Sequence, residues 1–265
     1  MSRFGRLAPR GARAPSERDW ERSAVLEPQL VPRHPELISD GGGLPFPPAA
    51  LAGSPGLLDP EDPAVGALIA QINAQGAPTS GFRAPWKRNA APQPVPRSLA
   101  AWRLLARTDG EALFARGQPP QLLTAAVRQD GRRGTWKCVA VSRARPLRAT
   151  RDGIRASGWR VDPTHELDPN ETMLRVLVTE QTFAGAQRAY GRVLAPDLHV
   201  NAVDLVLTMF VTPRPGPQVR APNPETPVRV ALPHPVGLRR LTDGALYDAT
   251  PGGPIPTHNV EADTA

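Results

Sequence analysis

The chain has 265 residues, including 33 prolines and 23 glycines, and its 32 basic and 25 acidic residues give a net charge of +7. A membrane-spanning helix needs a run of ~18 apolar residues, a disulfide scaffold needs paired cysteines, and collagen needs glycine at every third position. The sequence has none of these features, because it carries a single cysteine and its apolar residues and glycines are scattered.

Residues 1–58 are expected to form a long, extended, proline-rich arm. They show no sustained helical or strand period, and prolines block the backbone hydrogen bonds of both structures. A turn of helix is predicted only around 16–21. Because this composition cannot build a core of its own, we expect neighbouring subunits to hold the arm, with Trp20 and Phe46 docking on them as anchors.

A first helix is predicted over about 61–74, within a segment of short helices and linkers that we expect to span 59–118. An aspartate can cap this helix, and Pro63 suits its first turn. The proline-broken linker that follows contains Trp86, which we expect to be a third partner anchor.

A second short helix is predicted to start after the cap residue Ser98. Leu99, Trp102 and Leu105 would share one face of it. A short helical turn is also predicted at 111–116.

From about residue 119 the pattern changes to the alternation of β-strands. Asp130–Gly131 separates two alternating runs and predicts a hairpin turn. The spacing favours a mainly β fold: an antiparallel, immunoglobulin-like β-sandwich over 119–250, preceded by the two helices and the arm, and followed by a tail over 251–265. The predicted strands are 121–129, 135–142, 147–150, 154–161, 173–182, 188–194, 199–211 and 228–232.

The stretch from Leu174 to Asp248 contains a series of short motifs, which together resemble a domain of uncharacterised actinobacterial proteins. The resemblance covers about 100 of the 265 residues and implies a β-rich fold, but no chemistry, because the family has none assigned. The matching motifs are Val176–Glu180, Ala184–Gln187, Gly191–Val193, Leu205–Thr208, Thr212–Gly216, Asn223–Val228, Pro235–Gly237 and Leu241–Gly244, with Arg151–Ile154 and Ser157–Arg160 upstream.

One departure from that family concerns cysteine. Many relatives carry a cysteine at the positions of Phe183 and Ala221, and those relatives look exported, whereas this chain has neither. The joint replacement indicates either a copy that folds where disulfides do not form or simple drift of the lineage.

The motifs of common catalytic and metal sites are not found in the sequence. The five histidines lack metal-ligand spacing, and Gly131–Gly134 followed by Lys137 lacks the ending of a phosphate loop. Cys138 is expected to be a buried residue of a strand. We therefore predict a protein that is not an enzyme and that uses no metal or cofactor.

The excess positive charge lies in one segment, because residues 82–160 carry 17 basic and 4 acidic residues, a net charge of +13. Such a patch suits the phosphate backbone of nucleic acid, and it equally suits the acidic part of this chain or of a neighbouring subunit. The predicted basic patch consists of Arg132, Arg133, Lys137, Arg143, Arg145, Arg148, Arg151 and Arg155.

A small β-domain, a long arm, a basic face and the lack of a catalytic motif are together typical of large symmetric assemblies. We therefore predict a non-catalytic structural protein, most specifically an actinobacterial phage virion component: a capsid cement or minor capsid protein, or a tail or connector part. Its partners would be other subunits of the assembly, and not a membrane. Since no signal peptide or lipidation motif is seen, we expect synthesis in the cytoplasm and residence in the virion or particle. The alternative is a cytoplasmic nucleic-acid-associated protein that uses residues 82–160.

Overall fold

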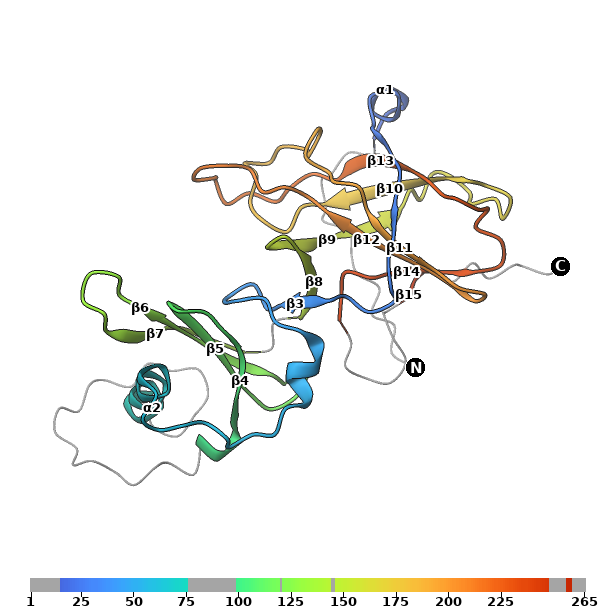
Figure 1. Cartoon of the computed structure of the whole chain (residues 1–265). Helices are drawn as coiled ribbons and strands as arrows, with labels where there is room; N and C mark the ends of the chain where they lie inside the picture. Colours follow the sequence, from blue (N-terminus) through green and yellow to red (C-terminus); the bar gives the residue numbers. More distant parts are fainter. Residues whose placement is uncertain (1–14, 76–98, 120, 144–145, 248–255, 259–265) are drawn as a thin grey trace. The chain divides into compact units, whose positions relative to one another are not determined.

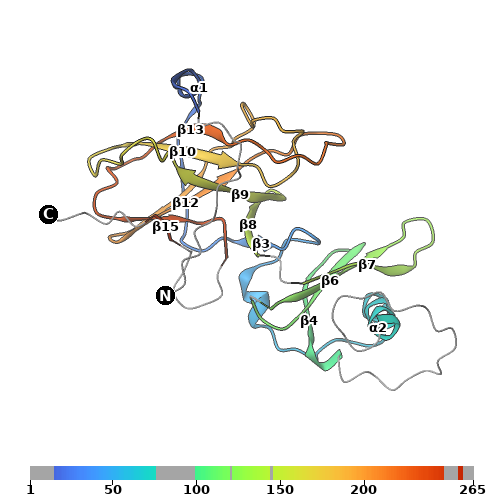
Figure 2. The same ribbon diagram turned by 180° about the vertical axis from the view of Figure 1, so that it is seen from behind.

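The structure is a computed structural model, and it describes residues 15–75, 99–119, 121–143, 146–247 and 256–258. The described residues are mainly β, as predicted. The chain divides into two compact units (Figures 1 and 2). Unit 1 comprises residues 1–34, 154–246 and 253–265, and unit 2 comprises residues 35–153 and 247–252. The division differs from the predicted boundaries, because unit 1 is assembled from segments that are distant in the sequence.

Unit 1 holds two groups of paired strands. The first runs in the order β1-β13-β10-β9 and the second in the order β2-β11-β12-β14-β15, and the last two residues of β12 pair with β9 and join the groups. The elements of unit 1 are α1 (Glu17–Glu21), β1 (Val25–Leu26), β2 (Gln29–Leu30), β9 (Ile154–Val161), β10 (Met173–Thr179), β11 (Asp197–Val200), β12 (Asp204–Phe210), β13 (Thr226–Ala231), β14 (Arg240–Asp243) and β15 (Pro256–His258).

Both strand groups of unit 1 contribute to one hydrophobic core. Every second residue of β10 points into it, beginning at Leu174, and so does every second residue of β12, beginning at Leu205. The indole of Trp159 on β9 is buried there and donates a 2.9 Å hydrogen bond to the carbonyl of Leu207. The alternation that predicted these strands is therefore the alternation of core-facing residues.

The pairing in unit 1 is mixed, and this corrects the expectation of a purely antiparallel sheet. β1 pairs with β13, β2 with β11, and β14 with β12 in parallel register. A parallel neighbour cannot be supplied by a tight hairpin, so each of these three strands comes from a more distant part of the chain. No strand forms over 188–194, where the structure has an isolated bridge between Val193 and Val211.

Unit 2 is built around a four-stranded antiparallel sheet with the order β4-β5-β6-β7. The helix α2 packs against β6 and β7 on one face of it (Figure 2). The elements of unit 2 are β3 (Leu37–Ser39), η1 (Pro48–Ala52), α2 (Pro63–Gln75), η2 (Leu99–Ala101), β4 (Trp102–Arg107), β5 (Glu111–Arg116), β6 (Leu123–Gln129), β7 (Trp136–Arg143) and β8 (Arg148–Arg151).

The sheet of unit 2 is covered on both faces. Phe114 of β5 packs with Leu68 of α2, whereas its neighbour Leu113 packs with Ile38 and Phe46 on the opposite face. The guanidinium of the buried Arg103 donates to backbone carbonyls of the η1 segment and of the β5–β6 turn, which fastens that covering segment to the sheet.

The first predicted helix is confirmed as α2, but two other helical predictions are wrong. Residues 99–107 form a single 3₁₀ turn followed by β4, and residues 111–116 form β5. Trp102 and Leu105, which would share a helix face, lie in different cores on opposite faces of the sheet. The predicted hairpin is confirmed, with β6 and β7 joined by a turn in which the Asp130 amide donates to the Thr135 carbonyl.

Candidate interaction surfaces

The described residues of the predicted arm pack against other parts of the same chain. Residues 15–34, which we name the strap, lie on unit 1 and contribute α1, β1 and β2 (blue in Figure 1). Residues 35–58 belong to unit 2, where β3 pairs with β8. The expectation of an arm held only by neighbouring subunits is therefore corrected for these residues, because both segments contact their own chain.

The strap pairs with a strand edge of each group in unit 1. The amide of Arg229 on β13 donates to the carbonyl of Ala24, at 3.0 Å. A few residues later, the amide of Gln29 donates to Pro196 at 2.8 Å, and the amide of Val31 donates to Leu198 at 3.0 Å. One short segment thus satisfies backbone groups on β13 and beside β11, which would otherwise be open strand edges.

Side chains fasten the start of the strap to unit 1. The Trp20 side chain is only 4% exposed, and the guanidinium of Arg175 on β10 lies 5.3 Å from its ring centroid. The Arg229 guanidinium donates to the hydroxyl and carbonyl of Ser23, at 3.1 and 3.0 Å. Burial of the indole and these charge-assisted hydrogen bonds stabilise the docked strap.

Asp19 joins the capping of α1 to the attachment of the strap. Its carboxylate accepts hydrogen bonds of 2.9 Å from the amide and the hydroxyl of Ser16, and it lies 2.6 Å from the Arg188 guanidinium. The Ser16 backbone hydrogen bond lowers the pKa of Asp19 to about 2, with further lowering by the Ser16 hydroxyl and by Arg188. The carboxylate therefore stays ionised down to strongly acidic pH.

The structure gives the predicted partner anchors another role. Phe46 is fully buried in the core of unit 2, and Trp20 of the strap is buried against unit 1 of its own chain. Both side chains are buried within this chain, so they offer no surface to a partner. The prediction that they dock on neighbouring subunits is therefore corrected. Trp86 lies outside the described residues.

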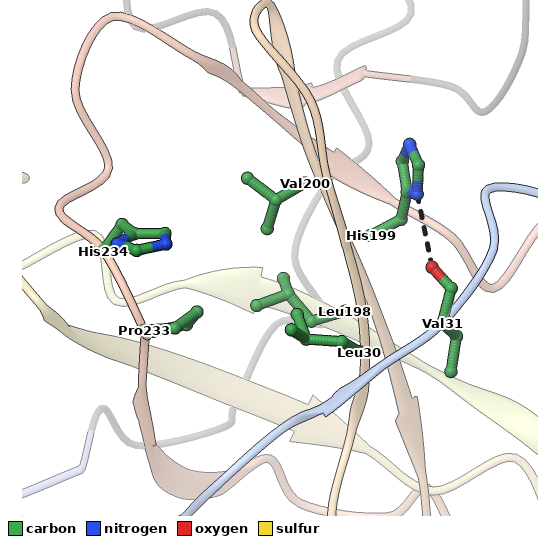
Figure 3. A pocket seen from close by; sticks show the side chains of 7 residues that line it. All are labelled: Leu30, Val31, Leu198, His199, Val200, Pro233 and His234. Carbon is green, nitrogen blue, oxygen red and sulfur yellow. Dashed lines mark hydrogen bonds between the residues drawn. The ribbon is translucent and has the colours of Figure 1, made fainter.

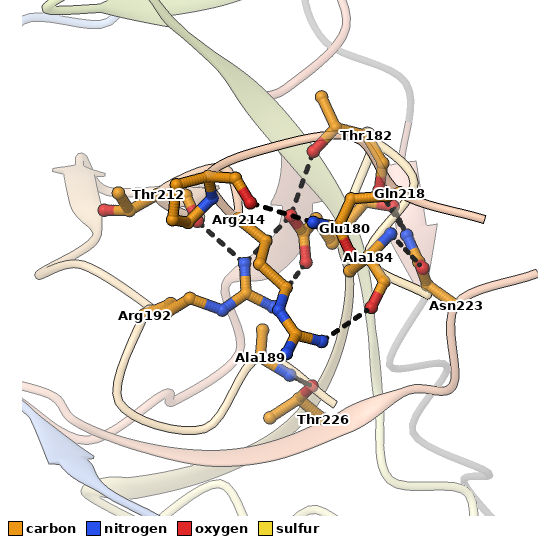
Figure 4. Close-up of polar contacts among 11 residues, drawn as sticks. Glu180, Thr182, Ala184, Ala189, Arg192, Thr212, Arg214, Gln218, Asn223 and Thr226 are labelled. Carbon is orange, nitrogen blue, oxygen red and sulfur yellow. Dashed lines mark hydrogen bonds and ion pairs between the residues drawn. The ribbon is translucent and has the colours of Figure 1, made fainter. Parts of the chain in front are cut away.

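A second group of contacts ties two long loops of unit 1 together (Figure 4). Glu180, which follows β10, has a side chain only 3% exposed and accepts two hydrogen bonds from Arg192, at 2.9 and 2.7 Å. Arg192 also donates to the Thr212 carbonyl at 2.8 Å. The loop after β10 is thereby fixed to the loop after β12.

Asn223 completes this link between the loops. Its amide nitrogen donates to the carbonyls of Glu180 and Thr182, and its amide oxygen accepts a 2.9 Å hydrogen bond from the Ala184 amide (Figure 4). Phe183 and Ala221 lie one and two residues from this last bond. Hydrogen bonds of one asparagine thus connect the loop after β10 to the loop before β13.

The described residues of the predicted basic patch lie on the β6–β7 hairpin and on the paired strands β8 and β9. Arg132 and Arg133 are exposed in the β6–β7 turn, beside Lys137, whose ammonium lies 4.0 Å from Asp130. Arg143 ends β7, Arg148 and Arg151 lie on β8, and Arg155 lies on β9, which belongs to the other unit. Arg145 lies outside the described residues.

The cross-strand register adds one residue to the three basic residues at the hairpin. Arg128 is paired with Lys137 across β6 and β7, and its guanidinium lies 3.1 Å from Glu111. The hairpin register could have predicted this neighbour, because residues at equal distances from a turn face each other. Four basic residues therefore lie on the β6–β7 hairpin, and we name them the hairpin patch: Arg128, Arg132, Arg133 and Lys137.

The described residues contain no group of three or more His, Cys, Asp and Glu side chains that could hold a metal ion. Cys138 is half-buried on β7, and burial raises the pKa of its thiol, so little of the nucleophilic thiolate forms at neutral pH. In the stretches that the structure describes, no helix is both long and apolar enough to cross a membrane.

The chain matches no protein-family model, no curated protein and no solved structure. The resemblance of residues 174–248 to uncharacterised actinobacterial proteins therefore stays a prediction.

Proposed function

We propose that the protein is a non-catalytic structural component of a large assembly, in which the strap is the element exchanged between subunits. A phage virion component, such as a capsid cement, minor capsid, tail or connector protein, is the form of this proposal that the sequence favours. The observation that carries the proposal is the pairing of the strap with β13 and β11.

Strand addition in parallel register does not require the added strand to be a sequence neighbour. The strap is joined to the rest of unit 1 only through residues 35–153, all of which belong to unit 2. The strap is thus added to unit 1 from a distant part of the chain. The backbone groups of β13 and β11 that pair with it can equally pair with the strap of another copy. Exchange of an identical element is a low-cost route from a monomer to an assembly.

A β-sandwich is the architecture that we infer for unit 1. The two strand groups place alternate side chains in one shared core, and they are joined along one side by the pairing of β12 with β9. The strap supports this inference, because it closes the opposite side, where β13 and β11 would be open edges.

Mixed disulfide formation tests strap exchange. In a Cys138→Ser background, one tagged copy carries Val25→Cys and a second, differently tagged copy carries Arg229→Cys, because these positions are partners in the β1–β13 register. We expect a disulfide between the two copies that increases with protein concentration, together with oligomers in light scattering.

The matched control replaces Arg229→Cys by Val219→Cys, an exposed loop position outside this register, which reports random collision. A monomer mass at every concentration, with no more mixed disulfide than this control, would contradict the proposal.

Nucleic-acid binding is the second candidate function, and the hairpin patch favours it. Among the described residues, no carboxylate pairs with Arg132 or Arg133. Their guanidiniums are therefore available to phosphates, and binding would weaken steeply with salt because counterions are released.

Salt-dependent binding of duplex DNA tests this second function. The double variant Arg132→Ser, Arg133→Ser is expected to lower the slope of log affinity against log salt by about 2. Arg220→Ser, an exposed arginine in a loop of unit 1, is the matched control and should leave the slope unchanged. Binding that does not depend on salt would exclude this function.

A further inference from the structure

Apolar side chains of unit 1 reach solvent beside the strap and on two of its loops. Beside the strap lies a pocket of about 320 Å³, lined by Leu30 and Val31 of the strap, by β11 and by the loop after β13 (Figure 3). The carbonyl of Val31 accepts a 3.2 Å hydrogen bond from His199 at the wall of this pocket. The pocket therefore belongs to the attachment of the strap, whereas the loops present a separate surface.

The loops that follow β10 and β12 form that separate surface, which we name the loop surface: residues 181–187 and 212–225. Phe183 on the first loop is 51% exposed, and Val219 on the second is 74% exposed. Phe183 directly precedes Ala184, whose amide donates to Asn223 of the second loop at 2.9 Å. Both exposed side chains thus belong to loops that hydrogen bonds hold together.

Further contacts keep the two loops side by side (Figure 4). The Arg214 guanidinium donates a 3.4 Å hydrogen bond to the carbonyl of Ala184. A Cβ at Gly185 would lie 3.4 Å from the side-chain oxygen of Gln218, the residue before Val219. The loop surface is therefore preorganised, and binding of a partner would cost it little conformational entropy.

The loop surface carries uncompensated positive charge. Its one acidic residue, Glu225, lies 2.6 Å from the guanidinium of Arg160 on β9. In the part of the chain that the structure describes, no carboxylate pairs with Arg214 or Arg220. Exposed aromatic and apolar side chains beside arginines are typical of protein interfaces. The partner that fits this surface is apolar and acidic.

Unit 2 presents a surface of that kind, which we name the acidic knob: residues 57–61. Leu57 is 84% exposed, and Asp59 and Glu61 are exposed two and four residues later. No basic residue occurs in residues 41–81 of the sequence, and none of the described cations pairs with these two carboxylates. The acidic knob therefore combines an exposed apolar side chain with uncompensated negative charge.

The acidic knob is fixed at both ends. Before it, the amide of Gly56 donates a 2.9 Å hydrogen bond to the carbonyl of Trp102. After it, Asp62 forms an ion pair with Arg107. Within it, Leu58 packs against the core that α2 shares with the sheet. The exposed residues of the knob are thus presented from a rigid base.

We propose that the acidic knob of one copy docks on the loop surface of a second copy. Leu57 contacts the exposed apolar side chains of the loops, and the carboxylates of the knob lie beside Arg214 and Arg220. This inference rests on the proposed assembly function, to which it adds a second contact between subunits. Because two different surfaces meet, the contact can continue from copy to copy.

Charge selects this pairing over symmetric contacts. Two loop surfaces would bring the unpaired guanidiniums of Arg214 and Arg220 against each other, and two acidic knobs would bring carboxylates together. Like charges that face each other across an interface cost several kcal/mol, whereas the knob and the loop surface attract each other.

A chain with a locked strap separates this contact from strap exchange. Val25→Cys and Arg229→Cys in one chain, in a Cys138→Ser background oxidised at low concentration, join β1 to β13 of the same copy. We expect sedimentation velocity to show that the locked chain still associates up to about 1 mM, because two small surfaces bind weakly. A monomer mass at every concentration would overturn this inference, while strap exchange would still stand on its own mixed disulfide.

Charge reversal in the locked chain tests which surfaces meet. Arg220→Glu and Glu61→Arg are each expected to raise the dissociation constant about tenfold. An equal mixture of the two variants should restore the native value, because the reversed loop meets the reversed knob and the native loop meets the native knob. Unchanged association in both variants would overturn the proposal, and so would a mixture that does not recover.

The matched controls make the same changes of charge outside the two surfaces. Arg132→Glu and Glu166→Arg alter exposed side chains of the β6–β7 turn and of the loop before β10. Their dissociation constants should stay within about twofold of the native value. Controls that weaken association as much as Arg220→Glu and Glu61→Arg would assign the effect to net charge and would overturn the proposed contact.

Discussion

At the scale of single residues, Glu180 is a buried charged group whose contacts restrict substitution. Its carboxylate is buried, and it is compensated by two hydrogen bonds from Arg192 and one of 2.9 Å from the Thr182 hydroxyl. A buried ion pair adds little net stability over an apolar pair of the same shape, but loss of one partner leaves an uncompensated charge. The pair therefore makes the loop connection sensitive to mutation.

Glu180→Ala is expected to lower the free energy of unfolding by about 3 kcal/mol, because Arg192 would lose its counter-charge while it stays largely buried. Chemical denaturation followed by circular dichroism measures this change. Glu166→Ala is the matched control, since Glu166 is exposed, and its effect should stay within about 0.5 kcal/mol. Equal effects of the two substitutions would show that the loop connection does not depend on the ion pair.

Asp19 predicts how the attachment of the strap depends on pH. Its pKa of about 2 in the folded chain lies below the ordinary value of 3.8, so the unfolded chain takes up the proton first as the pH falls. The contribution of Asp19 to stability is therefore present above about pH 4 and is lost between pH 4 and pH 2. Nuclear magnetic resonance titration of the Asp19 carboxyl should give a midpoint near 2, and Asp19→Asn should remove this part of the pH dependence. A midpoint near 3.8 would contradict the observed contacts with Ser16 and Arg188.

At the scale of elements, the strap is held mainly by its first half. Trp20 is buried and contacts Arg175, whereas Val25 and Leu30 of the short strands are largely exposed. β1 and β2 each contribute two residues to the ladders. Their pairing therefore depends on the anchoring of α1.

Trp20→Ala is expected to release the strap from unit 1 and to lower the free energy of unfolding by about 3 kcal/mol, because a large buried side chain is lost. Hydrogen exchange should show faster exchange at the amides of Gln29, Val31 and Arg229, which bridge the strap and unit 1. Val25→Ala, at an exposed position of β1, should leave these amides protected. Protection that persists in Trp20→Ala would show that the strands hold the strap without α1.

β4 and β5 show why two helical predictions failed. Apolar residues three positions apart suit one face of a helix, but in β4 the same spacing places Trp102 and Leu105 in two different cores. β5 is buried on both faces, so its sequence lacks the alternation that marks a strand with one exposed face. Local pattern cannot distinguish a strand between two cores from a helix.

At the scale of the whole molecule, the two units have separate cores. The sheet of unit 2 packs with α2 on one face and with residues 38–51 on the other, and all of these elements lie within residues 35–153. Unit 1, in contrast, needs the strap and the segment after residue 153. Unit 2 is therefore continuous in the sequence apart from a short later segment, and unit 1 is not.

Residues 35–153 are expected to fold without the rest of the chain, because they contain both cores of unit 2 except for a contact with Tyr247. Thermal unfolding followed by circular dichroism should show one cooperative transition. Residues 154–247 alone are the matched comparison, and we expect them to be much less stable, because they lack the strap over β13 and β11. A non-cooperative transition in residues 35–153 would contradict the assignment of a separate unit.

By itself, the sequence determined those elements whose signals are local: α2 with its proline in the first turn, the β6–β7 hairpin around Asp130, and the alternating strands β9 and β10. The single strand predicted over 199–211 is wrong, because β11 and β12 are two strands that pair with each other. Tertiary structure alone decided that Trp20 and Phe46 are core residues and that the strap joins two strand edges. These features depend on contacts between residues far apart in the chain. Their free energy comes from burial and pairing that no local window of sequence contains.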